Sequence, residues 1–126
     1  MRFGVNYTPS NGWFHQWLDP DWNSVDRDLK QIAELGMDHV RIFPVWPYLQ
    51  PNRTWINRKG VEDVRRMVHI AGEYGLDIYV DVFQGHLSSF DFLPSWLVTW
   101  HAGNMFVDPD AVSAECELIR TLGGVL

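Results

Sequence analysis

The chain has 126 residues, enough for one domain of ordinary size but too few for two. A formal net charge of −6, with no run of Lys and Arg, excludes the basic surface of a nucleic-acid-binding protein. No segment reaches the roughly 18 apolar residues of a membrane span and the N-terminus lacks the apolar core of a secretory signal, so we expect no membrane association and a cytoplasmic location.

The first predicted unit is a short strand at residues 2–7 (RFGVNY), a turn-rich aromatic loop at residues 9–22, and a helix. Asn23 or Ser24 is the expected N-cap of this helix, and Leu35-Gly36 is its expected end. Its apolar positions recur on one face, as in a helix that packs on a core. They are Val25, Leu29, Ile32 and Ala33.

The second predicted unit begins with the strand HVRIF at residues 39–43. The following loop, residues 44–55, contains three prolines and is expected to form neither strand nor early helix. A second helix then closes at Tyr74-Gly75. Its apolar stripe is Val61, Val64, Val68 and Ala71.

The third predicted unit begins with the apolar strand at residues 76–83, followed by the turn-rich segment FQGHLSSFDFLPSW at residues 83–96. Asp108-Pro109 provides an N-cap and a first-turn proline for a third helix. The single cysteine, Cys116, shares helical spacing with Val112 and Ile119, so we expect a packed thiol and no disulfide within the chain.

Strands that alternate with amphipathic helices predict an α/β fold with a parallel sheet. Long loops follow the strands while the returns from helix to strand are short, which favours a (β/α)8 TIM barrel over a doubly wound sheet. The first loop also lacks the G-x-G-x-x-G pattern of a dinucleotide site. A complete barrel needs about 250 residues. We therefore expect residues 1–126 to be an incomplete barrel of three βα units, with the remainder C-terminal to Leu126.

Arg41 is the first candidate site residue. Side chains alternate across a strand, so Val40 and Ile42 are expected to face the helices while Arg41 faces the barrel axis. An arginine there can hold a carboxylate through two hydrogen bonds. An internal ion pair, with Asp81 as the candidate partner, is an equally good interpretation.

His86 follows the third strand, where a ring nitrogen can bind a substrate hydroxyl or orient a carboxylate. A solvated or packed loop histidine is the simpler alternative. The sequence contains no H-x-H, H-E-x-x-H or C-x-x-C pattern, so we expect no metal and no cofactor.

Tryptophan is unusually frequent, with seven in the chain and an aromatic content of 14%. Aromatic faces stack on the C–H faces of sugar rings, so loop tryptophans predict a carbohydrate cleft; the alternative is that they seal the barrel top. Six tryptophans lie after predicted strands: Trp13, Trp17, Trp46, Trp55, Trp96 and Trp100.

Three segments carry a resemblance to a known family. HVRIFPVWPYLQP at 39–51, FQGHLSSFDFLPSWL at 83–97 and FVDPDAVSAECELIRTL at 106–122 resemble the first three βα units of clan A glycoside hydrolases, in particular cellulase-like members of family five. The resemblance covers essentially the whole chain. It implies a retaining glycosidase with two catalytic glutamates, an acid/base after an Asn at the end of the fourth strand and a nucleophile at the end of the seventh.

The resemblance assigns substrate-binding roles to individual residues. Arg41 corresponds to the arginine that steadies the nucleophile, and His86 to the histidine that lines the sugar subsite. Trp13 and Trp46 correspond by location to sugar platforms, and Trp96 to a wall of the cleft. Neither catalytic glutamate has a counterpart in this chain, so we expect a fragment of an enzyme acting on a β-linked oligo- or polysaccharide, inactive alone. The alternative is a non-catalytic carbohydrate-binding or assembly module; a metal-dependent barrel hydrolase ranks last.

Overall fold

The computed structural model describes residues 1–98 and 103–126, which form two compact units. The first unit contains Met1–Pro44 and Asp63–Asp81. The second contains Val45–Glu62 and Val82–Leu126.

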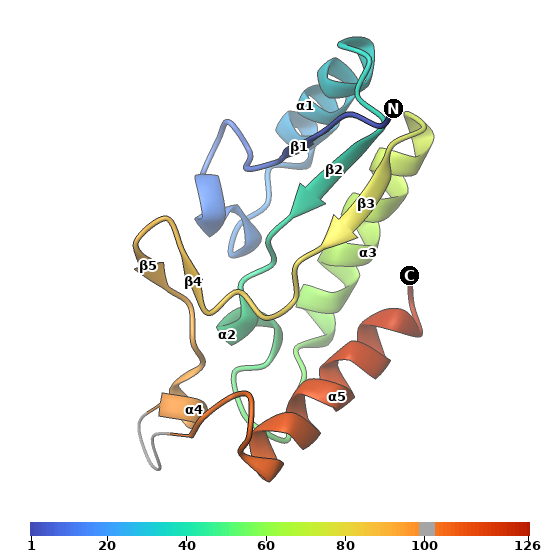
Figure 1. The fold of residues 1–126 in the computed structure, drawn as a ribbon. Coiled ribbons are helices and arrows are strands. Elements are labelled where there is room, and N and C mark those ends of the chain that lie inside the picture. The colour runs from blue at the N-terminus through green and yellow to red at the C-terminus, as the bar shows by residue number, and fades with distance from the viewer. Residues whose placement is uncertain (99–102) are drawn as a thin grey trace. The chain divides into compact units, whose positions relative to one another are not determined.

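A three-stranded parallel sheet forms the centre of the first unit (Figure 1). Its strands are β1 (Gly4–Asn6), β2 (His39–Ile42) and β3 (Asp77–Val80), in that spatial order. All three predicted strands are confirmed, although each is shorter than its apolar run. The sheet's strand order follows the chain order, as successive βα units require.

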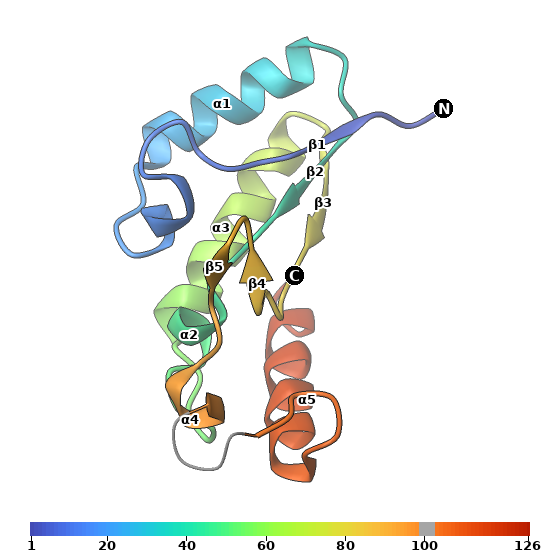
Figure 2. The ribbon, with the colours of Figure 1, turned by 60° about the vertical axis from the view of Figure 1, so that its left-hand side comes forward.

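The two faces of this sheet differ as the period-two pattern predicts. Val40 and Ile42 are buried, at 0% and 1% exposure. Helices α1 (Trp22–Glu34) and α3 (Arg58–Glu73) supply the other apolar side chains of this layer, and Figures 1 and 2 show α1 and the C-terminal part of α3 along one side of the sheet. Arg41 and Tyr79 project from the opposite face and are exposed.

The N-terminus of α1 differs from the prediction by two to three residues. Asp21 is the N-cap, and its side chain accepts a hydrogen bond from the Ser24 backbone N–H at 3.2 Å. Because that bond satisfies one free N–H of the first turn, Asn23 and Ser24 are left inside the helix. The predicted end is confirmed: Leu35 is the C-cap and Gly36 takes the left-handed φ of 84°.

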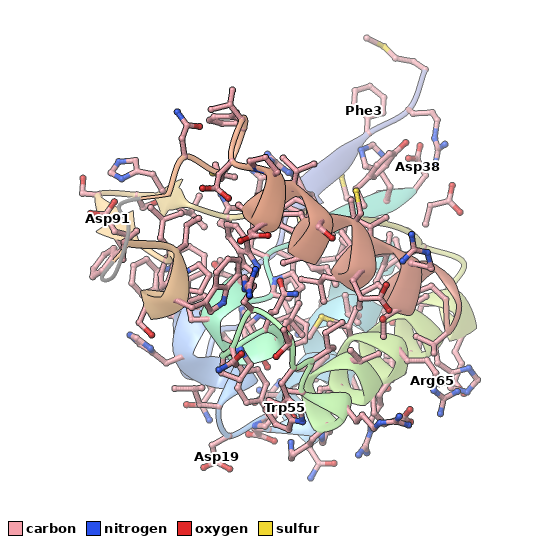
Figure 3. The ribbon with its side chains drawn as sticks, turned by 90° about the horizontal axis from the view of Figure 1, so that it is seen from below. Phe3, Asp19, Asp38, Trp55, Arg65 and Asp91 are labelled. Carbon is pink, nitrogen blue, oxygen red and sulfur yellow. The ribbon has the colours of Figure 1, made fainter. Side chains whose placement is uncertain are left out.

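Charged side chains tie the N-terminal ends of the strands together. The Asp38 carboxylate accepts from the Phe3 backbone N–H at 3.0 Å, and both residues are labelled in Figure 3. Arg2 donates to Asp38 at 3.3 Å and also pairs with Asp77. Hydrogen bonding from His39, with smaller contributions from Phe3 and Arg2, lowers the pKa of the Asp38 carboxyl.

The second unit contains two short helices, a hairpin and one long helix. The elements are α2 (Trp46–Leu49), the antiparallel pair β4 (His86–Leu87) and β5 (Phe90–Asp91), α4 (Ser95–Val98) and α5 (Pro109–Gly123). The expectation that residues 44–55 form no helix is wrong, because Pro47 occupies the first turn of α2, where its missing N–H costs no hydrogen bond. The hairpin was not predicted either; Ser88 and Ser89 both take positive φ at its turn.

Helix α5 has the predicted cap but a different buried face. The Asp108 side chain accepts from the backbone N–H groups of Asp110 and Ala111, and Pro109 is the first helical residue. The expectation of a packed thiol is wrong, because Cys116 is exposed. The buried face is instead Ala111, Ala114, Leu118 and Leu122. In the described part of the chain, none of the helices combines the length and apolarity of a membrane span.

Candidate functional site

Arg41 lies on the open face of the sheet, near the C-terminal end of β2. The strand register places Asn6 on one side of it and Tyr79 on the other, and the three residues line a groove of about 430 Å³. Its guanidinium donates to the carboxylate of Asp81, directly after β3. The Arg41–Asp81 ion pair, one of the two interpretations of Arg41 from the sequence, is therefore formed. The Arg41 side chain remains 49% exposed, so its other N–H donors are accessible from the groove.

A row of aromatic rings connects Arg41 with Trp13 in the first unit. The Arg41 guanidinium carbon lies 5.0 Å from the centre of the Phe43 ring. Phe43 meets Phe14 edge-on at 6.2 Å, and the Phe14 ring centre is 4.1 Å from that of Trp13. Two candidate residues that are far apart in the sequence are thus parts of one packed cluster.

Trp13 begins the short 3-10 helix η1 (Trp13–Trp17) in the loop after β1. Its φ of 52° lies in the left-handed region, which is unfavourable for a residue with a bulky side chain. Strained backbone of this kind persists only where surrounding contacts hold it, and such positions cluster at functional sites. Trp13 is 36% exposed, so it is only partly covered by the packed cluster.

A carboxylate on α1 anchors the start of this loop. The Tyr7 hydroxyl and the Ser10 backbone N–H each donate to Asp28 Oδ2 at 3.2 Å, and the Ser10 hydroxyl donates at 3.0 Å. Burial, with the nearby Asp28 charge, raises the pKa of the Tyr7 hydroxyl, so Tyr7 remains a donor across the physiological range. Asp28 was not predicted as an anchor of this loop, because in the sequence it looks like any other polar residue on the exposed face of a helix.

His86 is held at the hairpin of the second unit. Its Nδ1 lies 2.8 Å from Asp91 Oδ1, and the two residues are register partners on β4 and β5. A carboxylate on one ring nitrogen fixes the orientation of the imidazole and leaves Nε2 for another partner. Both side chains are well exposed, at 71% and 80%. Asp91, labelled in Figure 3, was not singled out from the sequence because the hairpin that brings it to His86 was not predicted.

Trp46 does not have the exposed position that a sugar platform needs. It is fully buried, and its ring contacts Phe83 at 5.0 Å and Trp96 at 5.9 Å, both edge-on. Its indole N–H donates to Gln50 Oε1 at 3.0 Å. A sugar ring cannot reach the Trp46 face in this structure, so we correct its expected role to that of a packing support.

Gln50 joins three parts of the second unit. Its side-chain Nε2 donates to the Ala114 carbonyl of α5 at 2.9 Å, and its backbone carbonyl accepts from Trp96 Nε1 at 2.9 Å. Trp96 is therefore oriented by hydrogen bonding as well as by the Trp46 ring. It remains partly exposed and lines a pocket of about 460 Å³ with Arg53 and Asp108.

The three remaining loop tryptophans are Trp17, Trp55 and Trp100, and the two that the structure describes differ in burial. Trp17 is buried at 3% exposure and closes the core, whereas Trp55 is 56% exposed. Trp100 lies outside the described residues. Within residues 1–98 and 103–126, no group of three His, Cys, Asp or Glu side chains is arranged to hold a metal ion.

Comparison with known proteins shows what the chain is similar to. The chain matches none of the protein-family models. A solved structure of a GH5_18 enzyme from Bifidobacterium longum subsp. longum, a variant in complex with Manb1-4GlcNAc, is 82% identical over the whole of this chain, with a TM-score of 0.97. The exo-beta-1,4-mannosidase Op5Man5 from an Opitutaceae bacterium is 27% identical over the same extent, with a TM-score of 0.91.

A curated relative supports the same family. Cellodextrinase A from Ruminococcus flavefaciens is 33% identical over 67 residues, which is 53% of this chain and 20% of the relative. The chain spans 30% of the Bifidobacterium enzyme and 22% of the mannosidase. Its three parallel strands and their helices are the N-terminal βα units of an incomplete TIM barrel, as predicted. By sequence and fold, the chain corresponds to the N-terminal part of a cellulase-like, family five glycoside hydrolase of clan A.

Proposed function

We propose that this chain is the N-terminal part of a retaining glycoside hydrolase that cleaves β-linked oligosaccharides at a terminal mannose. The observation that carries the proposal is the end-to-end match, at 82% identity, with an enzyme whose variant was solved with Manb1-4GlcNAc. The mannosidase that shares the fold at 27% identity points to the same sugar.

In this proposal the chain supplies substrate binding and support for the nucleophile. Arg41 donates to a carboxylate at the barrel mouth with the N–H groups that Asp81 does not use. Trp13 stacks on a sugar ring, and His86, oriented by Asp91, donates or accepts at a sugar hydroxyl. Trp96 walls the cleft, held by Gln50.

The catalytic pair itself lies outside residues 1–126 in this proposal. A retaining enzyme needs two carboxyl groups about 5 Å apart, one to protonate the leaving oxygen and one to attack the anomeric carbon. The glutamates of the chain all lie on helices, and the strand-end carboxylate Asp81 is paired with Arg41. We therefore expect the 126-residue chain alone to be inactive.

A fusion enzyme tests this proposal. It consists of residues 1–126 followed by the part of the Bifidobacterium longum GH5_18 enzyme that lies beyond the aligned region. We expect the fusion enzyme to hydrolyse Manb1-4GlcNAc and an aryl β-mannoside, and to prefer the mannoside over the aryl β-glucoside and β-galactoside. The 126-residue chain is expected to show no turnover. Turnover by the short chain, or a fusion enzyme that folds but cleaves none of these substrates, contradicts the proposal.

The exposed aromatic residues favour one alternative, a carbohydrate-binding module without catalysis. Trp13 and Trp55 are 36% and 56% exposed and are able to stack on sugar. This alternative predicts that the short chain binds oligosaccharide, seen as a change in tryptophan fluorescence during titration at millimolar sugar. An unchanged spectrum from a chain shown to be folded by circular dichroism excludes it.

A further inference from the structure

The loop after β2 places an exposed tryptophan in a groove of the second unit. Trp55 is 56% exposed, more than any other tryptophan that the structure describes, and it is labelled in Figure 3. The groove has a volume of about 590 Å³, which is within the usual range of small-ligand sites. It lies between this loop, the first turn of α3 and the C-terminal half of α5, and is called the Trp55 groove below. Its other lining residues include Arg53, Arg58, Val61, Glu62 and Glu117.

Hydrogen bonds and an ion pair hold the walls of the Trp55 groove in place. The Trp55 backbone N–H donates to the Asn52 carbonyl at 3.1 Å, which closes the turn that carries the indole. Arg53 pairs with Asp110 of α5 at 2.8 Å, and the bond from Gln50 to α5 fixes the same loop at its start. A ligand that enters a groove with fixed walls loses less conformational entropy on binding.

The charges around the Trp55 groove restrict the class of ligand. Arg53 and Arg58 are exposed beside Glu62 and Glu117, so both signs of charge line the same groove. An acidic polymer would meet two carboxylates there, and an apolar helix would bury charged side chains without compensation. A neutral oligosaccharide is complementary to this lining, because its C–H face packs on the Trp55 ring while its hydroxyl groups donate to carboxylates and accept from guanidinium groups.

We propose that the Trp55 groove is a second saccharide-binding site, which binds a neutral oligosaccharide by stacking on Trp55 and by hydrogen bonding to Arg58. Arg58 is the better donor of the two arginines, because Arg53 is already paired with Asp110. The inference goes beyond the proposed function, since the groove lies within one unit of this chain and requires no catalytic carboxyl group. Such a site raises the apparent affinity for a long or branched glycan, because a chain held at one point has a high effective concentration at the other.

Fluorine nuclear magnetic resonance of the fusion enzyme, labelled with 5-fluorotryptophan, locates binding at this groove. The Trp55 signal is the one that disappears in Trp55→Phe. The probes are cellohexaose and chitohexaose, which are neutral and contain no mannose, so the proposed reaction does not consume them. We expect at least one of them to shift the Trp55 signal until it saturates, with a Kd of about 1 mM or below.

Arg58→Ala tests the hydrogen-bonding part of the site, with the Trp55 signal as the readout. We expect the Kd for the hexaose to rise about ten-fold, the size expected when a charged donor is lost. The matched control is Arg65→Ala. Arg65 is an exposed arginine on the same helix, is labelled in Figure 3 and does not line the groove, so its removal should leave the Kd unchanged.

Several results would overturn the proposal. They are a Trp55 signal that neither hexaose shifts in a folded fusion enzyme, and equal Kd values for Arg58→Ala and Arg65→Ala. Tighter binding of hexagalacturonate than of the neutral hexaoses would assign the groove to an acidic ligand instead. A Trp55 signal that shifts with protein concentration in the absence of sugar would assign it to a second copy of the chain.

These readouts do not depend on glycosidase activity. A fusion enzyme whose Trp55 signal responds to a hexaose but which does not cleave Manb1-4GlcNAc contradicts the proposed function and leaves the Trp55 groove as a saccharide site. A fusion enzyme that cleaves the disaccharide while its Trp55 signal stays unchanged overturns only the second site.

Discussion

Two buried glutamines, Gln50 and Gln16, allow a matched test of how much hydrogen bonding inside the protein contributes to its stability. Gln50 and Gln16 are 1% and 3% exposed, so their desolvation is nearly equal. Gln50 accepts from Trp46 at 3.0 Å and donates to the Ala114 carbonyl at 2.9 Å, whereas neither polar atom of the Gln16 side chain has a partner among the described residues. The same substitution, Gln to Leu, is therefore expected to have opposite effects at the two positions.

Gln50→Leu removes two hydrogen bonds and leaves the buried indole N–H of Trp46 without an acceptor. We expect it to lower the free energy of unfolding by about 2–4 kcal/mol, the sum of the lost bonds and the unpaired donor. With a urea dependence near 3 kcal/mol per molar, the unfolding midpoint of the fusion enzyme should fall by about 1 M. Gln16→Leu should leave the midpoint unchanged or raise it, since two buried unpaired atoms disappear. Tryptophan fluorescence in urea measures both midpoints, and equal losses of stability at the two positions would contradict the difference in hydrogen bonding between Gln50 and Gln16.

Three further predictions concern the fusion enzyme. Trp13→Ala should raise KM for Manb1-4GlcNAc about ten-fold, equivalent to about 1.4 kcal/mol of lost stacking, with a smaller effect on kcat; an unchanged KM contradicts a platform role. Trp46→Phe should lower the free energy of unfolding by about 2 kcal/mol, measured by urea titration, because the Trp46 ring packs in the buried interior. It should leave KM within two-fold, since the ring does not contact the substrate. A large rise in KM with unchanged stability contradicts that role. Asp38 has a pKa lowered by its bond to His39, so its contribution to stability is present above the unfolded value of 3.8 and is lost as pH falls through the lower folded value. Asp38→Asn should therefore reduce the loss of stability in this acidic range, measured by urea titration at several pH values, and an unchanged pH dependence contradicts the linkage.

The parts of the fold that follow from local chemistry could be predicted from the sequence. The Asp108-Pro109 cap and the Gly36 helix end were predicted correctly, because each depends on the φ preference or hydrogen-bonding group of one or two residues. The alternation of Val40 and Ile42 against Arg41 was also predicted correctly, since the strand period is two.

The features that depend on tertiary contacts could not be predicted in this way. The hairpin turn uses Ser88-Ser89, which lacks the Asn-Gly signal, so the Asp91 partner of His86 was missed with it. On α5 two apolar stripes compete, and periodicity alone does not say which one is covered. Trp46 illustrates the same limit, because the sequence places it in a loop but does not show that Gln50 and its neighbouring rings bury it.

The most direct measurement is the stereochemistry of the reaction catalysed by the fusion enzyme. Proton nuclear magnetic resonance of Manb1-4GlcNAc hydrolysis, recorded before mutarotation is complete, shows which anomer of mannose forms first. We expect the β-anomer, because a glycosyl-enzyme intermediate retains the configuration of the bond that is cleaved. The α-anomer as first product, or a folded fusion enzyme without turnover, would contradict the assignment of this chain to a retaining glycoside hydrolase.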